Sequence, residues 1–171
     1  MTARRRFRKC IAAPCVGAAL TLGFGLLLAS AARVDPARAA TTERVVTDRN
    51  TGLAIYGVDP VAYFTDRKAV VGRAEFEFRF AGAVWRFHNE GNRAAFAADP
   101  KVYSPRFGGY DPVGIARGVS TPGYPQLWAI VNDRLYLFYT ADARAAFMAD
   151  PAAAIAAAEA RWAEVMRQLA E

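Results

Sequence analysis

Two stretches of this chain have the pattern of a β-hairpin, in which two segments rich in apolar residues flank a two-residue turn. In the first, Phe76, Phe78 and Phe80 alternate with charged residues, which is the period-two pattern of a half-buried strand. The two-residue turn Ala81-Gly82 follows, and Asn132-Asp133 is its counterpart in the second stretch. The pattern predicts two β-hairpins, with strands over residues 75–80, 83–87, 127–131 and 134–139.

The residues after each hairpin repeat as well. Residues 87–100 align without gaps with residues 138–151, at an offset of 51, and both copies contain Arg-Ala-Ala-Phe followed after two residues by Asp-Pro. We therefore expect an α+β fold of two tandem ββα units, with a C-terminal helix packed on small antiparallel sheets.

Capping residues indicate where the helices begin and end. Asn89 is suited to cap a helix over residues 90–98, which ends at Asp99-Pro100 because proline disfavours helical geometry in the residue before it. Thr140 and Asp142 both suit the cap of the second short helix. A last helix is expected over residues 152–170, where the apolar residues fall on one side.

Glycine, proline and aromatic residues crowd the segment between the two units, residues 103–125. Turn-forming residues at this density predict an ordered loop rather than a flexible linker. Asp59 before Pro60 likewise predicts a turn, in which the aspartate caps its own backbone. Because ordered loops often carry binding residues, we expect functional chemistry near residues 103–125.

The N-terminus has the pattern of an export signal. An arginine-rich block at residues 4–9 precedes an uncharged apolar run over residues 16–32, and small residues around Arg38 suit a signal peptidase. We expect cleavage after Ala39, so that residues 1–39 are a signal peptide, 40–54 an N-terminal extension and 55–171 the domain. The arginine-rich block suits twin-arginine export as well as the general secretory route. Either route leads to a periplasmic or secreted protein without a stable membrane span.

Removal of this signal changes the charge and the cysteine content. The whole chain has a net charge of +6, but cleavage removes seven basic residues and one acidic residue, which leaves 15 of each. A neutral domain without a basic stripe does not favour nucleic-acid binding. Cleavage also removes Cys10 and Cys15, the two cysteines of the chain, so neither a disulfide nor a thiolate metal site is expected.

Five short motifs resemble, in order and spacing, the exported stand-alone proteins of the YHS family. They are Tyr-Gly-Val-Asp-Pro-Val-Ala-Tyr-Phe at 56–64, Trp-Arg-Phe at 85–87, Asn-Arg-Ala-Ala-Phe-Ala-Ala-Asp-Pro at 92–100, Tyr-Ser-Pro at 103–105 and Phe-Gly-Gly-Tyr at 107–110. The resemblance covers residues 55–162. It implies a small α+β fold related to metal-binding treble-clef-like modules, and it implies no particular activity.

The chain departs from that family at the positions of its cysteines. Where shorter YHS modules carry thiolates for soft metal ions, this sequence has Ala62, His88 and Asn92. Asp111 stands where exported relatives often carry a cysteine, so thiol redox chemistry is not expected. His88 is the one histidine of the chain. A metal site would therefore combine His88 with carboxylates such as Asp111, Asp59 or Glu90.

We expect a non-catalytic module that binds a small ligand or a hard or borderline metal ion. The candidate ligand-binding residues are His88, Tyr103, Phe107, Tyr110 and Asp111, of which His88 and Asp111 are the candidate metal ligands. One alternative is a thiol-less relative of a redox or metal-handling protein, with His88 and Asp111 as an acid/base pair. Another is a structural protein that docks a partner. A local role for His88, satisfying backbone groups at a strand-to-helix junction, also stays open.

Overall fold

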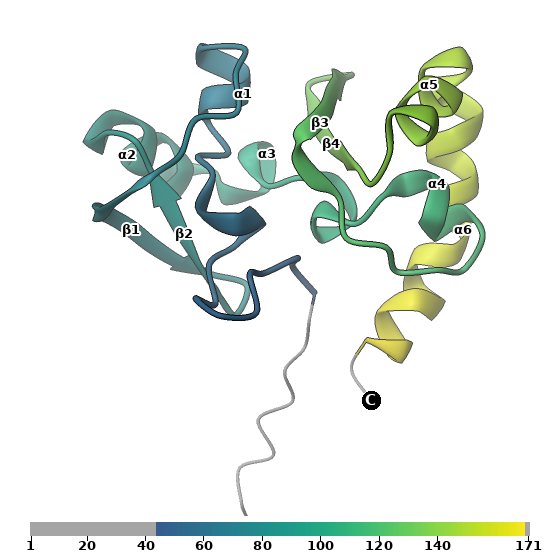
Figure 1. Cartoon of the computed structure of the whole chain (residues 1–171), viewed down its shortest axis with the longest axis horizontal. Helices are drawn as coiled ribbons and strands as arrows, with labels where there is room; N and C mark the ends of the chain where they lie inside the picture. Colours follow the sequence, from purple (N-terminus) through teal and green to yellow (C-terminus); the bar gives the residue numbers. More distant parts are fainter. Residues whose placement is uncertain (1–43, 170–171) are drawn as a thin grey trace, which may run out of the picture. The chain divides into compact units, whose positions relative to one another are not determined.

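The computed structural model describes residues 44–169, so the expected signal peptide and the first residues after it lie outside the described part. Two pairs of strands are separated and flanked by helices, in the arrangement of Figure 1. In order, they are η1 (Ile55–Gly57), α1 (Ala62–Thr65), β1 (Arg73–Phe80), β2 (Ala83–Phe87), α2 (Glu90–Ala98), α3 (Pro100–Tyr103), η2 (Arg106–Gly109), α4 (Pro112–Ala116), β3 (Tyr124–Val131), β4 (Arg134–Phe138), α5 (Ala141–Ala149) and α6 (Pro151–Gln168).

Each hairpin forms its own two-stranded antiparallel sheet, β1 with β2 and β3 with β4. Within each hairpin the register shifts once, between Arg73 and Glu77 in β1 and between Tyr124 and Trp128 in β3. These shifts allow both long strands to begin earlier than the alternation of residues predicts. The predicted α+β class, with two small antiparallel sheets and a C-terminal helix, is confirmed, whereas the internal repeat stays a prediction.

Side-chain caps account for where α2, α4, α5 and α6 begin. Asn89 caps α2, which spans residues 90–98 as predicted, through a 2.8 Å hydrogen bond from the Asn92 N–H to its side-chain oxygen. At α5 the cap is Thr140, whose hydroxyl accepts from Ala143 N–H at 3.0 Å. The segment expected to be loop, residues 103–125, contains the 3-10 helix η2 and the helix α4. Helix α4 begins here because Asp111 caps it and a proline follows at the first helical position.

Phe96 of α2 is the centre of the first core cluster. This side chain is fully buried, and four aromatic rings from the first hairpin surround it. The centroids lie 5.0 Å away for Trp85, 5.1 Å for Phe87, 5.9 Å for Phe80 and 6.1 Å for Phe78. The alternating phenylalanines of β1 therefore serve to bind α2 to its sheet.

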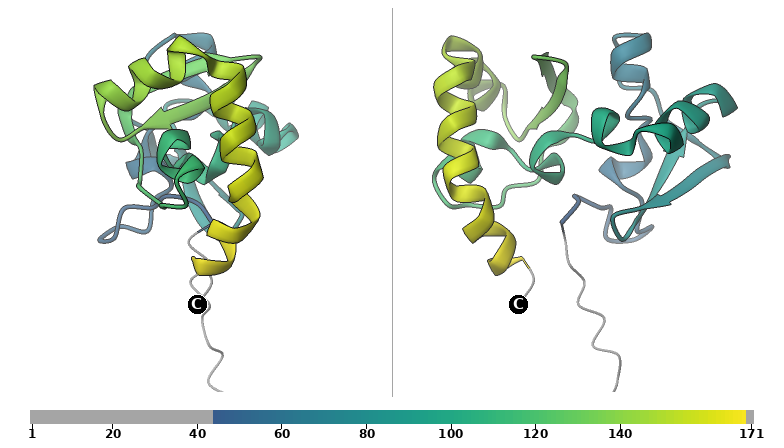
Figure 2. Two further views of the ribbon diagram at one scale, coloured as in Figure 1. Left: turned by 90° about the vertical axis from the view of Figure 1, so that its right-hand side faces the viewer. Right: turned by 180° about the vertical axis from the view of Figure 1, so that it is seen from behind.

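In the second hairpin, strand β4 is buried on both faces. Leu135 and Leu137 of β4 belong to the first core cluster, while Tyr136 and Phe138 belong to a second cluster with α4, α5 and α6. Figure 2 shows α6 running beside α4 and α5. Because side chains alternate along a strand, β4 contributes to both clusters, which explains its continuous run of apolar residues.

Tyr63 connects the first half of the domain to β3. Its side chain is fully buried, its hydroxyl donates to the Pro125 carbonyl at 2.9 Å, and its ring meets Trp128 edge-on at 5.2 Å. Burial raises the pKa of the Tyr63 phenol above its ordinary value of 10.0, and the nearby charge of Asp59 adds to this shift.

Tyr63→Phe is expected to lose about 1 kcal/mol of unfolding free energy at pH 8, because the Pro125 carbonyl loses its donor. Since the pKa is higher in the folded state, the contribution of the neutral phenol is complete below pH 10 and falls as pH rises further, by about 1.4 kcal/mol per unit. Urea denaturation should therefore show wild type and Tyr63→Phe at nearly equal stability by pH 11. If the wild type and Tyr63→Phe differed in unfolding free energy by the same amount at pH 8 and at pH 11, this expectation would be wrong.

Candidate functional site

Two of the candidate ligand residues contribute to packing. Tyr103 is half-buried and meets Phe64 edge-on, with the ring centroids 5.5 Å apart. Phe107 is 4% exposed and lies in the second core cluster, where its ring contacts Tyr136 and Trp162. Burial of this kind explains both residues without a ligand.

Asp59 is the acceptor for five hydrogen bonds, and its side chain is fully buried. One carboxylate oxygen accepts from the N–H groups of Val61 and Ala62 at 2.8 and 3.3 Å, which confirms the predicted Asp-Pro turn. The other oxygen accepts from the His88 backbone N–H at 2.9 Å, from the His88 ring nitrogen Nδ1 at 2.8 Å and from the Asn92 side-chain amide at 2.8 Å. The carboxylate thus joins the start of α1 to the strand-to-helix junction at the start of α2.

The His88 ring uses both of its nitrogens. Nδ1 donates to Asp59, and Nε2 accepts from the side-chain amide of Asn89 at 2.7 Å. Asp66 is the nearest further carboxylate, with an oxygen 3.8 Å from Nε2. A metal ion at Nε2 would have to displace Asn89, the residue that caps α2. The contacts of His88 are therefore those of a local structural residue.

Asp111 has a comparable set of partners in the second half of the domain. It is 3% exposed and accepts from the N–H groups of Val113 and Gly114 at 2.8 and 3.4 Å, and from the Tyr139 N–H at 2.9 Å. The structure therefore pairs His88 with Asp59 and ties Asp111 to the end of β4. It does not bring His88 and Asp111 together as a metal site or as an acid/base pair.

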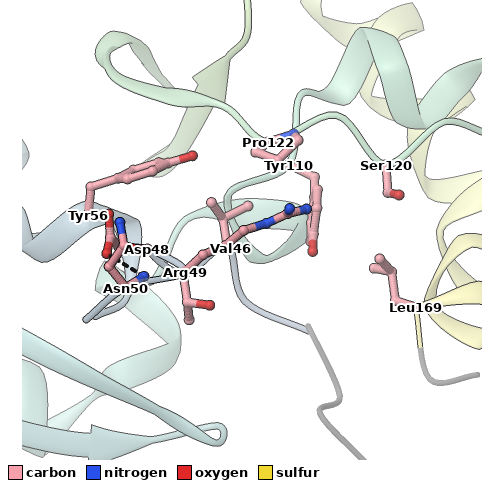
Figure 3. A pocket seen from close by; sticks show the side chains of 10 residues that line it. Val46, Asp48, Arg49, Asn50, Tyr56, Tyr110, Ser120, Pro122 and Leu169 are labelled. Carbon is pink, nitrogen blue, oxygen red and sulfur yellow. Dashed lines mark hydrogen bonds between the residues drawn. The ribbon is translucent and has the colours of Figure 1, made fainter. Parts of the chain in front are cut away.

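The structure contains a pocket of about 450 Å³, which we call the Tyr56 pocket. Of the five candidate residues, Tyr110 alone lines this pocket. It is lined by residues 46–50, Tyr56, Tyr110, Ser120, Pro122 and Leu169 (Figure 3). Residues distant in sequence thus meet here: the strand-like segment before η1, the loops on either side of α4, and the end of α6.

Charged and polar groups occupy one wall of the Tyr56 pocket. One oxygen of Asp48 accepts from Asn50 N–H at 3.0 Å, from Thr51 N–H at 2.8 Å and from the Thr51 hydroxyl at 2.9 Å. The hydrogen bonds from Thr51, followed by that from Asn50, lower the pKa of Asp48 below its ordinary value and keep it ionised. Arg49 extends across the pocket toward Tyr110 (Figure 3). The wall therefore carries one negative and one positive group.

Tyr56 lies on a strained turn. Its φ is 59° and that of Ile55 before it is 41°, so two residues with side chains adopt the left-handed conformation in succession. This conformation costs a non-glycine residue about 1–2 kcal/mol. The left-handed turn in η2, at residues 107–109, has Gly108 at its centre. Burial, and then the neighbouring Tyr124 and Asp48, raise the pKa of Tyr56 above its ordinary value, so the phenol stays neutral at physiological pH.

Sequence reasoning did not place Tyr56 or residues 48–50 among the candidate ligand residues. A local signal was present, because Asp48 followed by Asn50 and Thr51 is typical of a side-chain-capped turn. That signal indicates a turn and does not indicate which side chains from other elements face it. The expected N-terminal extension, residues 40–54, provides half of the pocket lining.

Comparison of the chain with protein-family models, with curated protein sequences and with solved structures finds no match. Among the helices within residues 44–169, none combines the length and the apolar character needed to cross a membrane.

Proposed function

We propose that this chain is an exported, non-catalytic binding module of the YHS kind, whose small-molecule ligand occupies the Tyr56 pocket. The pocket carries the proposal, because its volume of about 450 Å³ falls in the range of small-molecule sites, roughly 300–1,000 Å³. It also combines apolar side chains with a few polar groups, as such sites do. The five motifs and the N-terminal pattern support the family and the export.

A small molecule fits this chain better than a metal ion does. The buried carboxylates of Asp59 and Asp111 already accept hydrogen bonds from five and three donors. Within residues 44–169, no group of three or more His, Cys, Asp or Glu side chains is arranged to hold a metal ion. The side chains of Arg49, Asn50 and Ser120 in the Tyr56 pocket have capacity left to bind a ligand.

Ser120→Trp tests this function by filling the pocket from its rim, where Ser120 is half-buried. Fragments that shift the NMR resonances of Tyr56 and Tyr110 in the wild type should bind Ser120→Trp at least about tenfold more weakly, because the indole occupies their volume. The measurement is a fragment screen by protein-observed NMR, with circular dichroism to verify the fold.

Gln126→Trp is the matched control. Gln126 is exposed and lies in a separate groove along β3, so the same added indole should leave fragment binding at the wild-type level. If no fragment contacts the Tyr56 pocket in the wild type, or if Ser120→Trp binds fragments as the wild type does, the proposed function is wrong.

A further inference from the structure

The side chain of Tyr56 gains little from its strained position. Although φ is 59°, the residue is 38% exposed, so burial of the ring does not account for a tyrosine here. A glycine would adopt this backbone conformation without strain, as Gly108 does in the left-handed turn of η2. Non-glycine residues held in such conformations cluster at ligand-binding and active sites. The strain therefore indicates that the ring itself serves binding.

The polar groups around this ring have unused hydrogen-bonding capacity. In the part of the chain that the structure describes, no protein group bonds to the second oxygen of Asp48, the Arg49 guanidinium, the Asn50 side-chain amide, the Ser120 hydroxyl or the Tyr56 hydroxyl. Together they offer both donors and acceptors. A ligand that satisfies them must itself carry several groups that donate and accept, as hydroxyl groups do.

The charges at the pocket favour an uncharged ligand. Arg49 would attract an anion, but the ionised Asp48 is its neighbour in the chain and lines the same wall. An anionic ligand would meet the repulsion of Asp48, and a cationic ligand that of Arg49. An uncharged ligand meets neither, and it can accept from Arg49 while it donates to Asp48.

Exposed tyrosine rings continue beyond the pocket. Tyr124 and Tyr139 are 48% and 45% exposed, and their rings stack with centroids 5.4 Å apart and planes 20° apart. Tyr124 is also close enough to Tyr56 to contribute to the raised pKa of its phenol. A sugar ring has an apolar C–H face and polar hydroxyl groups along its edge. Flat aromatic faces beside hydroxyl-binding groups are suited to bind such a ring.

We infer that the Tyr56 pocket binds a saccharide, with the ring of Tyr56 stacked on the sugar and Asp48, Arg49 and Asn50 bonded to its hydroxyl groups. This inference rests on the proposed function, since it names the ligand class of the same pocket. Tyr124 and Tyr139 provide a surface for a second sugar unit.

A titration with defined probes tests the ligand class. The saccharide probes are the methyl glycosides of glucose, galactose, mannose and N-acetylglucosamine, together with cellobiose and maltose, and the charged ring probes are benzoate and phenyl phosphate. At least one saccharide should shift the NMR resonances of Tyr56, and neither anion should. Ser120→Trp should abolish the shift, and Gln126→Trp should preserve it.

The outcomes separate this inference from the proposed function. If benzoate or phenyl phosphate binds in the pocket and no saccharide does, the inference is overturned while the proposed function stands. If neither the saccharides nor any fragment contacts the pocket, both are overturned. A saccharide that binds equally well to Ser120→Trp lies elsewhere and also overturns the inference.

Substitutions of Tyr56 test the role of the strained ring. Tyr56→Phe keeps the ring and should bind the saccharide within about threefold of the wild type, whereas Tyr56→Gly should bind at least about tenfold more weakly because stacking is lost. Tyr56→Gly should nevertheless melt at the same temperature as the wild type or higher, because it relieves the left-handed strain. Undiminished binding by Tyr56→Gly would overturn the inference. If both the melting temperature and the binding of Tyr56→Gly fell, the ring would serve the fold, and the inference would again be overturned.

Discussion

Asp59→Ala is expected to lower the free energy of unfolding by about 3–5 kcal/mol. The carboxylate is fully buried and accepts five hydrogen bonds. Alanine would leave these donors without an acceptor, and buried donors without partners are costly. The loss would affect the start of α1 and the start of α2 together, because both depend on this one side chain.

Urea denaturation followed by circular dichroism measures the effect. Asp59→Asn keeps the shape of the side chain but turns an amide group toward the donors of His88 or Asn92, so it should cost about 2–4 kcal/mol. Asp66→Ala is the matched control, since Asp66 is exposed and lies 3.8 Å from the His88 ring; it should change stability by no more than about 0.5 kcal/mol. A loss below about 1 kcal/mol in Asp59→Ala would show that this network does not stabilise the fold.

Phe96→Ala is expected to destabilise the protein by a similar amount, about 3–5 kcal/mol. Phe96 is fully buried, and its ring packs against two rings from each strand of the first hairpin. Truncation would remove this apolar burial and leave a cavity that the surrounding rings can fill only in part. Since α2 has nine residues, its stability depends on this packing more than on helix propensity.

Thermal and urea denaturation measure the stability of Phe96→Ala, and two further variants serve as comparisons. Phe96→Leu keeps most of the apolar volume and should lose about 1–2 kcal/mol. Met148→Ala, at a residue on α5 that is 45% exposed, should stay within about 0.5 kcal/mol of the wild type. Equal losses in Phe96→Ala and Phe96→Leu would indicate that the ring is not the centre of the first core cluster.

The elements that the sequence predicted well are those specified by near neighbours. Alternation of phenylalanine with charged residues located β1, and the Asn89 cap with Asp99-Pro100 located α2. The turn at Asp59 is of the same kind, because its carboxylate bonds the backbone two and three residues ahead. Such interactions depend on spacing along the chain, which is printed in the sequence.

Prediction was weaker where turn residues also began a helix. Proline and glycine between the hairpins indicated loop, yet Asp111 and Pro112 begin α4 within that segment. The same residue types serve turns and the first helical positions, so their composition alone does not separate the two. The helix is favoured here because Ile115 of α4 is buried in the second core cluster.

Tertiary structure alone decided which distant side chains meet. His88 lies 29 residues from Asp59 in the chain and 23 residues from Asp111, and nothing in the spacing distinguishes the two carboxylates as partners. The fold distinguishes them, because each Asp-Pro turn packs against the end of the hairpin in its own half and accepts from the residue there, His88 or Tyr139.

The sequence by itself determined the fold class, the two hairpins, the positions of α2, α5 and α6 and the residue types available for chemistry, since these follow from local periodicity and capping. The tertiary structure decided that residues 46–50, Tyr56, Tyr110 and the end of α6 form one pocket. The physical reason is that a binding site requires groups from several elements to converge, and that convergence is set by how the two core clusters pack rather than by order along the chain.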